Sequence, residues 1–179
     1  MFQRLFAKPD QSKRTLLDHS VREIIDTKKR IGTELRVALY YFEEQKFIVS
    51  ATCSIVECGE PTVLDTSVSD EILGLTVCDK LLEYSPKNTR DLSGYTSKDW
   101  AVYKVSGAKT TKYFERESTY VSITTMNSAI QIEASPRISN VPELKALCSI
   151  SNGWSHAAIG EAIRRAIGAC KVLRDAGVL

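Results

Sequence analysis

The chain has 179 residues, of which 43% are apolar and 26% charged, a composition typical of a globular protein with a hydrophobic core. No stretch approaches the ~18 consecutive apolar residues of a transmembrane helix, and residues 1–14 lack the features of a secretion signal. We therefore expect a cytoplasmic protein with no membrane partner, folded as a single domain over residues 1–179.

The net charge of +2 conceals an uneven distribution. Residues 1–40 carry nine basic and five acidic side chains, residues 41–100 carry five and eleven, and residues 101–179 carry ten and six. An acidic middle segment can attract a basic partner if its carboxylates share one face. The simpler alternative is that these acids only solvate the outside of a sheet and a helix.

The first half of the chain predicts one helix, four strands and a second helix. Apolar residues at helical spacing predict a helix over residues 12–30. Dense β-branched and aromatic residues over residues 33–57 then predict a hairpin, with a polar tip at Glu43–Lys46, and a third strand. Cys58–Pro61 predicts a turn into a short fourth strand, and residues 69–84 predict a helix.

The second half repeats this order. Residues 85–99 are rich in turn formers and predict a linker. Alternating residues predict a pair of strands between residues 100 and 114, separated at Gly107, and a hairpin over residues 120–132. A loop, a short helical or extended piece and a final helix over residues 155–170 follow. The halves, residues 33–84 and 100–173, thus each predict four strands and a helix.

The last helices of the two halves share the template Ser-x-x-x-(Leu/Ile)-Gly-x-x-(Val/Ile)-x-x-x-(Leu/Ile), at residues 69–81 and 155–167. Ser69 and Ser155 are suitable N-caps. Gly74 and Gly160 occupy positions where alanine is the better helix former by ~1 kcal/mol, so we expect a packing role, with each glycine letting its helix lie close to the sheet. The repeated template indicates an internal duplication and an α+β fold, in which two β-β-β-β-α repeats form an antiparallel sheet packed with helices, plus an N-terminal helix.

The residues that carry chemistry are few. The two histidines, His19 and His156, have no assignable nucleophile beside them, and no phosphate loop or metal motif occurs. The acidic pairs Glu43–Glu44 and Asp70–Glu71 point in different directions on a regular element. We therefore predict no enzyme activity, no cofactor and no metal. The scattered cysteines, Cys53, Cys58, Cys78, Cys148 and Cys170, predict buried reduced thiols and neither a disulfide framework nor a zinc site.

Single-stranded nucleic acid is an alternative partner. The segment 103–116 interleaves Lys104, Lys109, Lys112 and Arg116 with three aromatic residues, Tyr103, Tyr113 and Phe114. The competing interpretation is an amphipathic hairpin with lysines outside and aromatics in the core, and the main hypothesis includes no nucleic acid.

The doubled Ser-Gly helix, introduced by GEPTVLDTSVSDEILG at residues 59–74, and the SGAKTTKYFERES segment at residues 106–118 resemble the immunity proteins of bacterial contact-dependent growth inhibition. The resemblance extends from about Thr33 to Val172. It departs from the family in having His156-Ala157-Ala158 where acidic residues usually follow the second cap, and residues 1–30 have no counterpart.

The resemblance implies a small cytoplasmic protein that binds the C-terminal toxin domain of a large surface effector and blocks its active site. In some members the toxin is similar to an RNA-cutting nuclease, and the implied fold is similar to that of the Whirly single-stranded-DNA-binding proteins. A nuclease that approaches phosphate is often basic, so carboxylates suit its inhibitor. The acidic middle offers these candidate toxin-binding residues: Glu43, Glu44, Glu57, Glu60, Asp65, Asp70 and Glu71.

Overall fold

The computed structural model describes residues 19–54, 56–86, 96, 99–127, 129–136, 145–151 and 155–176. Its elements, in chain order, are α1 (His19–Ile31), β1 (Arg36–Phe42), β2 (Lys46–Cys53), β3 (Val56–Asp65), α2 (Asp70–Leu82), α3 (Ala101–Ser106), α4 (Thr111–Glu117), β4 (Ser118–Met126), β5 (Ala129–Pro136), β6 (Ala146–Ser151) and α5 (His156–Asp175). None of the described helices has the length and apolarity needed to cross a membrane.

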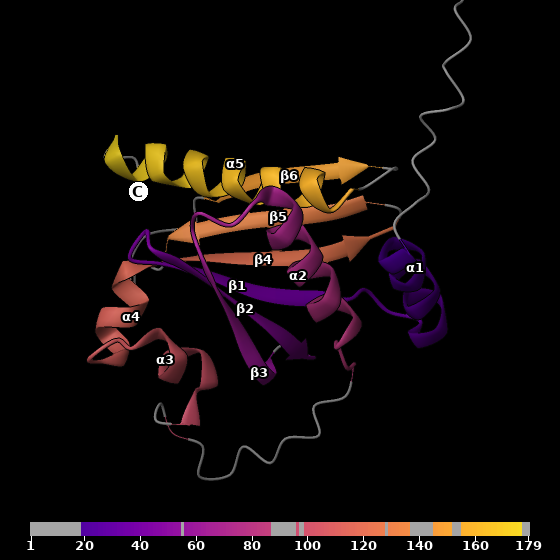
Figure 1. The fold of residues 1–179 in the computed structure, drawn as a ribbon, viewed down its shortest axis with the longest axis horizontal. Coiled ribbons are helices and arrows are strands. Elements are labelled where there is room, and N and C mark those ends of the chain that lie inside the picture. The colour runs from indigo at the N-terminus through magenta and orange to yellow at the C-terminus, as the bar shows by residue number, and fades with distance from the viewer. Residues whose placement is uncertain are drawn as a thin grey trace, which may run out of the picture.

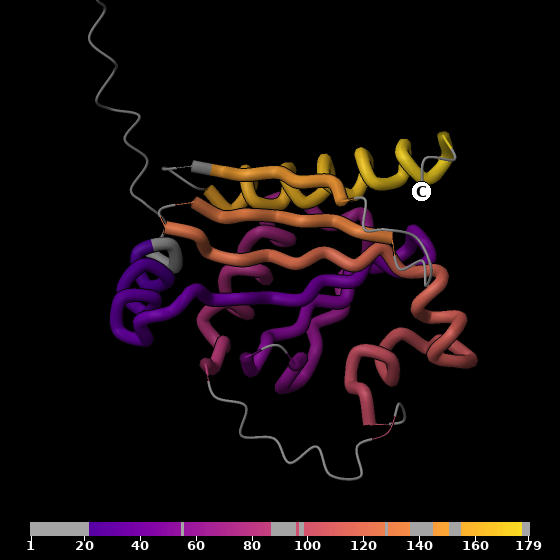
Figure 2. The backbone as a smooth tube through the Cα atoms, turned by 180° about the vertical axis from the view of Figure 1, so that it is seen from behind, coloured from indigo at the N-terminus to yellow at the C-terminus, as the bar shows by residue number. Residues whose placement is uncertain are grey.

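The strands form one six-stranded sheet in the order β3-β2-β1-β4-β5-β6. Every neighbouring pair is antiparallel, and the first strands of the two halves, β1 and β4, pair at the centre. Figure 1 shows α2 and α5 packed together in front of the strands, and Figure 2 gives the opposite view. The α+β fold with an antiparallel sheet and an N-terminal helix is therefore confirmed.

Side-chain alternation along β1 divides the core between the two faces of the sheet. Val37 and Leu39 belong to the larger core, which α2 and α5 cover. Tyr40 and Phe42 point to the opposite face, where they join Phe114 of α4 in a smaller aromatic cluster. The period of two that identifies a strand thus fixes which residues lie under each helix layer.

Each half contributes three strands and not the predicted four. The expected turn at Cys58–Pro61 lies inside β3, which runs unbroken from Val56 to Asp65. Gly59 has a φ of 69°, a left-handed conformation that glycine adopts at little cost. Pro61 is tolerated because β3 is an edge strand and its missing N–H removes no obligatory hydrogen bond.

The predicted strands between residues 100 and 114 are wrong, because this segment forms the helices α3 and α4. Gly107, with a φ of 74°, ends α3, and the Thr110 hydroxyl caps α4 by accepting a hydrogen bond from the Tyr113 N–H. Helices this short contain too few turns for their sequence period to be separated from strand alternation. The lysines are exposed and Phe114 is buried, so the predicted separation of lysines and aromatics holds on a helical backbone.

The expectation of reduced thiols throughout is also wrong. Cys53 and Cys58 form a disulfide between β2 and β3, with their Cα atoms 5.7 Å apart. The antiparallel register brings them together, since Cys53 pairs with Val56 and Ala51 with Cys58. Cys78 and Cys170 are buried free thiols, and burial raises the pKa of Cys170.

Parts of three predictions lie outside the described residues, and one of them is the loop predicted between the second hairpin and the last helix. The other two are residues 12–18 of the first predicted helix and most of the predicted linker over residues 85–99. The hairpin predicted over residues 120–132 is present as β4 and β5, and the piece before the last helix is the strand β6.

Candidate functional site

The seven carboxylates predicted to bind a partner do not gather on one face. They lie in three places: two in the turn between β1 and β2 (Glu43, Glu44), three on β3 (Glu57, Glu60, Asp65) and two in the first turn of α2 (Asp70, Glu71). The carboxylates in each place have different partners. These partners show which acids stabilise the fold and which could bind another molecule.

The third place, the first turn of α2, borders a close crossing of α2 and α5. Ser69 and Ser155 accept hydrogen bonds from the N–H groups of Ile72 and Ala158 and begin the two helices. A Cβ atom added to Gly74 would overlap the carbonyl oxygen of His156, and one added to Gly160 would overlap that of Asp70. The absence of a side chain at each glycine therefore lets the first turn of the other helix pack directly against it. The expectation that the glycines face the sheet is corrected to a reciprocal helix–helix contact.

The acids of α2 are bound within this crossing. Arg164 of α5 places Nε 2.7 Å from Oδ1 of Asp70, and the same guanidinium donates to the carbonyl oxygens of Thr66 and Val68. The Arg164 guanidinium also lies 5.1 Å from the centre of the Phe47 ring. His156 Nδ1 lies 3.3 Å from Oε1 of Glu71. Asp70 and Glu71 thus hold the two helices together.

The β3 acids are mixed in their roles. Glu57 accepts a hydrogen bond from the hydroxyl of Tyr40, whose ring is buried in the aromatic cluster. Asp65 stabilises the turn after β3, because hydrogen bonds from the side chain and N–H of Ser67 lower the pKa of its carboxylate. Glu60 contributes its carbonyl oxygen to the buried Lys80, 2.9 Å away, which ties β3 to α2.

The β1–β2 turn holds Glu43 and Glu44 in an unusual backbone conformation. Their φ angles are 52° and 56°, and the Gln45 N–H donates to the Phe42 carbonyl at 3.0 Å to close the turn. Two consecutive left-handed residues are typical of turns that favour Asn-Gly, and non-glycine residues adopt this conformation at a cost of about 1 kcal/mol or more each. This turn presents two carboxylates despite that cost.

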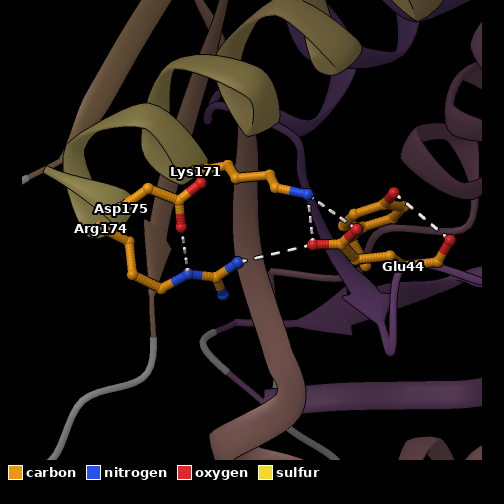
Figure 3. A network of polar contacts seen from close by, with 5 residues as sticks. Glu44, Lys171, Arg174 and Asp175 are labelled. Atoms are coloured by element: carbon orange, nitrogen blue, oxygen red, sulfur yellow. Dashed lines mark hydrogen bonds and ion pairs between the residues drawn. The ribbon is translucent and has the colours of Figure 1, made fainter.

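A pocket of about 440 Å³ lies beside this turn, between the turn, α4 and the last turns of α5. In Figure 1 these three segments meet at one end of the molecule. Glu44 binds Lys171 with an Nζ–Oε1 distance of 2.7 Å and lies 3.6 Å from Nη2 of Arg174, as Figure 3 shows. The hydrogen bond between Glu44 and Lys171 lowers the pKa of the carboxylate and raises that of the ammonium group.

Glu43 faces a different partner in the same pocket. The hydroxyl of Tyr113 donates to its Oε1 at 2.5 Å, and this hydrogen bond raises the pKa of Tyr113. The Glu43 N–H donates to the carbonyl of Glu117 at 3.1 Å, which ties the turn to the end of α4. Glu43 and Glu44 were predicted from the sequence, and Tyr113 was predicted only as part of a nucleic-acid segment. Lys171 and Arg174 were not predicted, because nothing in the local pattern indicates that α4 and α5 end beside this turn.

The remaining sequence candidates add no second site. His156 belongs to the helix crossing, and the side chain of His19 lies outside the described part of the chain. Among the residues that the structure describes, no three His, Cys, Asp or Glu side chains gather in a way that could hold a metal ion.

The sequence matches no protein-family model and no curated protein. Its fold is similar to that of a protein of unknown function from Neisseria meningitidis, with a TM-score of 0.62 and 17% identity over 77% of this chain and 96% of that chain. It is also similar to a chain of the CdiA-CT/CdiI toxin and immunity complex from Yersinia pseudotuberculosis, with a TM-score of 0.56 and 18% identity over 77% and 98%. At these identities the likeness establishes a shared fold.

Proposed function

We propose that this protein is an immunity protein, which binds the toxin domain of a contact-dependent growth inhibition effector and neutralises it by covering its active site. The observation that carries the proposal is the fold shared with a chain of the CdiA-CT/CdiI toxin and immunity complex, nearly all of whose length is matched. The resemblance of the sequence motifs to the immunity family also supports it, and two of these motifs form the glycine crossing of α2 and α5.

The proposed partner is a basic, RNase-type nuclease domain. A protein that binds phosphate backbones carries positive charge near its active site, and carboxylates of an inhibitor can steer and hold that surface. Of the seven candidate acids, Asp70 and Glu71 are engaged at the helix crossing and Asp65 stabilises its own turn. Glu44 is ion-paired with Lys171 and Glu57 accepts a hydrogen bond from Tyr40, so we propose that the toxin interface centres on Glu43 and Glu60.

Neutralisation by this route needs no chemistry from the inhibitor. The protein acts by occupying the toxin surface, so the rate of toxin turnover falls with the fraction bound. Affinity depends on a few well-packed contacts, while the surrounding charges set the association rate and its salt dependence.

The test is to co-express the protein with the toxin domain encoded immediately upstream of it. We expect restored growth and a complex that survives purification, with an association rate that falls as salt rises. A toxin domain from an unrelated effector serves as the control and should remain lethal. Failure to protect cells, together with failure of the purified proteins to associate, would overturn the proposal.

Oligonucleotide binding is the outcome that would favour the alternative function. Tight binding to single-stranded DNA or RNA, with no binding to the toxin, would identify a nucleic-acid-binding protein. The structure offers that alternative less support than the sequence, since the basic aromatic segment forms two short helices whose Phe114 is buried under the sheet.

A further inference from the structure

The pocket beside the β1–β2 turn contains a carboxylate that no cation neutralises. Glu44 is bound to Lys171, and Glu117 is paired with Arg116 at 2.6 Å. Glu43 has the neutral hydroxyl of Tyr113 as its side-chain partner, and within the described residues no lysine or arginine pairs with it. An ionised carboxylate can accept about four hydrogen bonds, so Glu43 retains the capacity for further donors.

We propose that this pocket receives a cationic side chain of the toxin domain, an arginine in particular, which binds the Glu43 carboxylate. This inference rests on the proposed function and assigns it a specific anchor. An arginine supplies a planar set of donors that matches a carboxylate in a bidentate pair, which a lysine ammonium cannot do. A partially desolvated pair of this kind contributes more to affinity than one at an exposed rim.

The walls of the pocket suit a guanidinium group. The rings of Tyr41 and Tyr113 both line it, and aromatic faces attract guanidinium ions. The chain itself shows the preference, because the Arg116 guanidinium lies 5.3 Å from the centre of the Tyr113 ring. Ile167 of α5 adds an apolar surface against which the methylene stem of an arginine can pack.

The two cations that line the pocket, Lys171 and Arg174, both have a carboxylate partner inside it. Lys171 and Arg174 both interact with Glu44, which draws their charge to the α5 side of the pocket. Glu43 is held on the α4 side by Tyr113 and by its own N–H to the Glu117 carbonyl. The volume of about 440 Å³ lies within the range of sites that enclose a ligand group.

The first experiment compares two variants that each remove one negative charge. Glu43→Gln removes the proposed anchor, and Glu161→Gln removes an exposed carboxylate of α5 that pairs with Arg165 and lies outside the pocket. We expect Glu43→Gln to weaken toxin binding by about tenfold or more, mainly through faster dissociation, while Glu161→Gln changes affinity less than twofold. Unchanged melting temperatures would show that both variants are folded.

Wild-type affinity in the Glu43→Gln variant would overturn the inference and leave the proposed function standing. Where the loss is seen, a double-mutant cycle with each arginine of the toxin replaced by glutamine should give one pair with strong coupling. Absence of coupling with every arginine and lysine would also count against the inference.

A second measurement separates this inference from the proposed function, because it needs no toxin. N-acetyl-L-arginine amide is titrated into the protein while backbone amide NMR signals are followed, with the neutral isostere N-acetyl-L-citrulline amide as the control. We expect saturable shifts at residues 41–45 and 113–119 with the arginine probe alone, and their loss in Glu43→Gln. Equal shifts with both probes, or none up to high millimolar concentration, would contradict the assignment of a cation site.

Discussion

The helix crossing and the turn pocket each contain a pair of adjacent acids, and the two pairs have opposite fates. Asp70 binds Arg164 and Glu71 lies within contact distance of His156, both on the facing helix. In the turn, Glu44 forms an ion pair with Lys171, whereas Glu43 accepts a hydrogen bond from the neutral hydroxyl of Tyr113. Acidic composition therefore does not identify a binding surface. What distinguishes a candidate interface is a carboxylate whose charge the rest of the described chain leaves uncompensated.

The sharpest test of the crossing as a rigid element is Gly160→Ala. Its new Cβ would overlap main-chain atoms of Asp70, so α2 and α5 must separate, and we expect a loss of about 3 kcal/mol or more in the free energy of unfolding. Gly74→Ala should behave alike, because it meets the main chain of His156. Urea denaturation followed by circular dichroism measures the change.

Gly168→Ala is the matched control on the same helix. Nothing lies within 4 Å of the position where its Cβ would stand, so the better helix propensity of alanine should leave stability unchanged or raise it by roughly 0.5–1 kcal/mol. Equal effects of the changes at positions 160 and 168 would refute the close crossing.

Arg164→Ala should give the next largest effect. It removes donors to Asp70 and to two carbonyl groups together with the contact on Phe47, and with the side chain partly exposed we expect a loss of about 1–2 kcal/mol. Arg164→Lys should recover only part of it, since an ammonium cannot span the same acceptors. Arg165→Ala, which breaks an exposed pair on the same helix, should cost no more than about 0.5 kcal/mol.

Glu44→Gln should have a smaller, pH-dependent effect on stability, a fraction of a kcal/mol as for exposed ion pairs. The pKa of Glu44 in the folded protein lies below its ordinary value of 4.5, so the stabilisation is complete above the unfolded-state pKa and is lost as pH falls through the folded value. The difference in melting temperature between wild type and variant should therefore shrink below about pH 4.5. A difference that stays constant through acid pH would exclude the ion pair as its cause.

The smallest expected effect is a change in the pKa of Tyr113, with no change in stability. The hydrogen bond to Glu43 raises the pKa of Tyr113, so its phenol should ionise at higher pH than an ordinary tyrosine. Glu43→Gln should return that pKa toward its normal value, as followed by the NMR signals of the Tyr113 ring. Tyr113 titrating identically in both proteins would show that the two side chains do not meet in solution.

The sequence predicts the fold where a period repeats for long enough. The hairpins around Glu43 and Asn127 and the capped helices after Ser69 and Ser155 follow from alternation, turn residues and caps. The helices within residues 101–117 were predicted as strands. Helices of six and seven residues have too few turns for a helical period to be recognised in the sequence. The unbroken β3 differs from the predicted turn because a glycine and a proline mark turns in most contexts, whereas an edge strand accommodates both.

The site was less predictable, because its geometry depends on tertiary contacts. The template predicts that Gly74 and Gly160 lie on the packing side of their helices. It does not predict which surface each glycine faces. Glu43 and Glu44 could be proposed from charge and turn position, whereas Tyr113 and Lys171 reach them from 70 and 127 residues away along the chain. Only the order of the strands and the course of α5 bring these groups to one end of the sheet.

The obstacle at each glycine of the crossing is a carbonyl oxygen, which every amino acid possesses. A clash with a neighbouring side chain can be relieved by shortening that neighbour, but no compensating substitution can shorten the peptide backbone. A genetic screen for suppressors of Gly160→Ala should accordingly return true revertants or globally stabilising changes elsewhere, and no local partner at Asp70. Folding therefore forbids a side chain at either glycine of the crossing, whereas a change of a pocket side chain such as Glu43 is constrained by binding and not by the backbone.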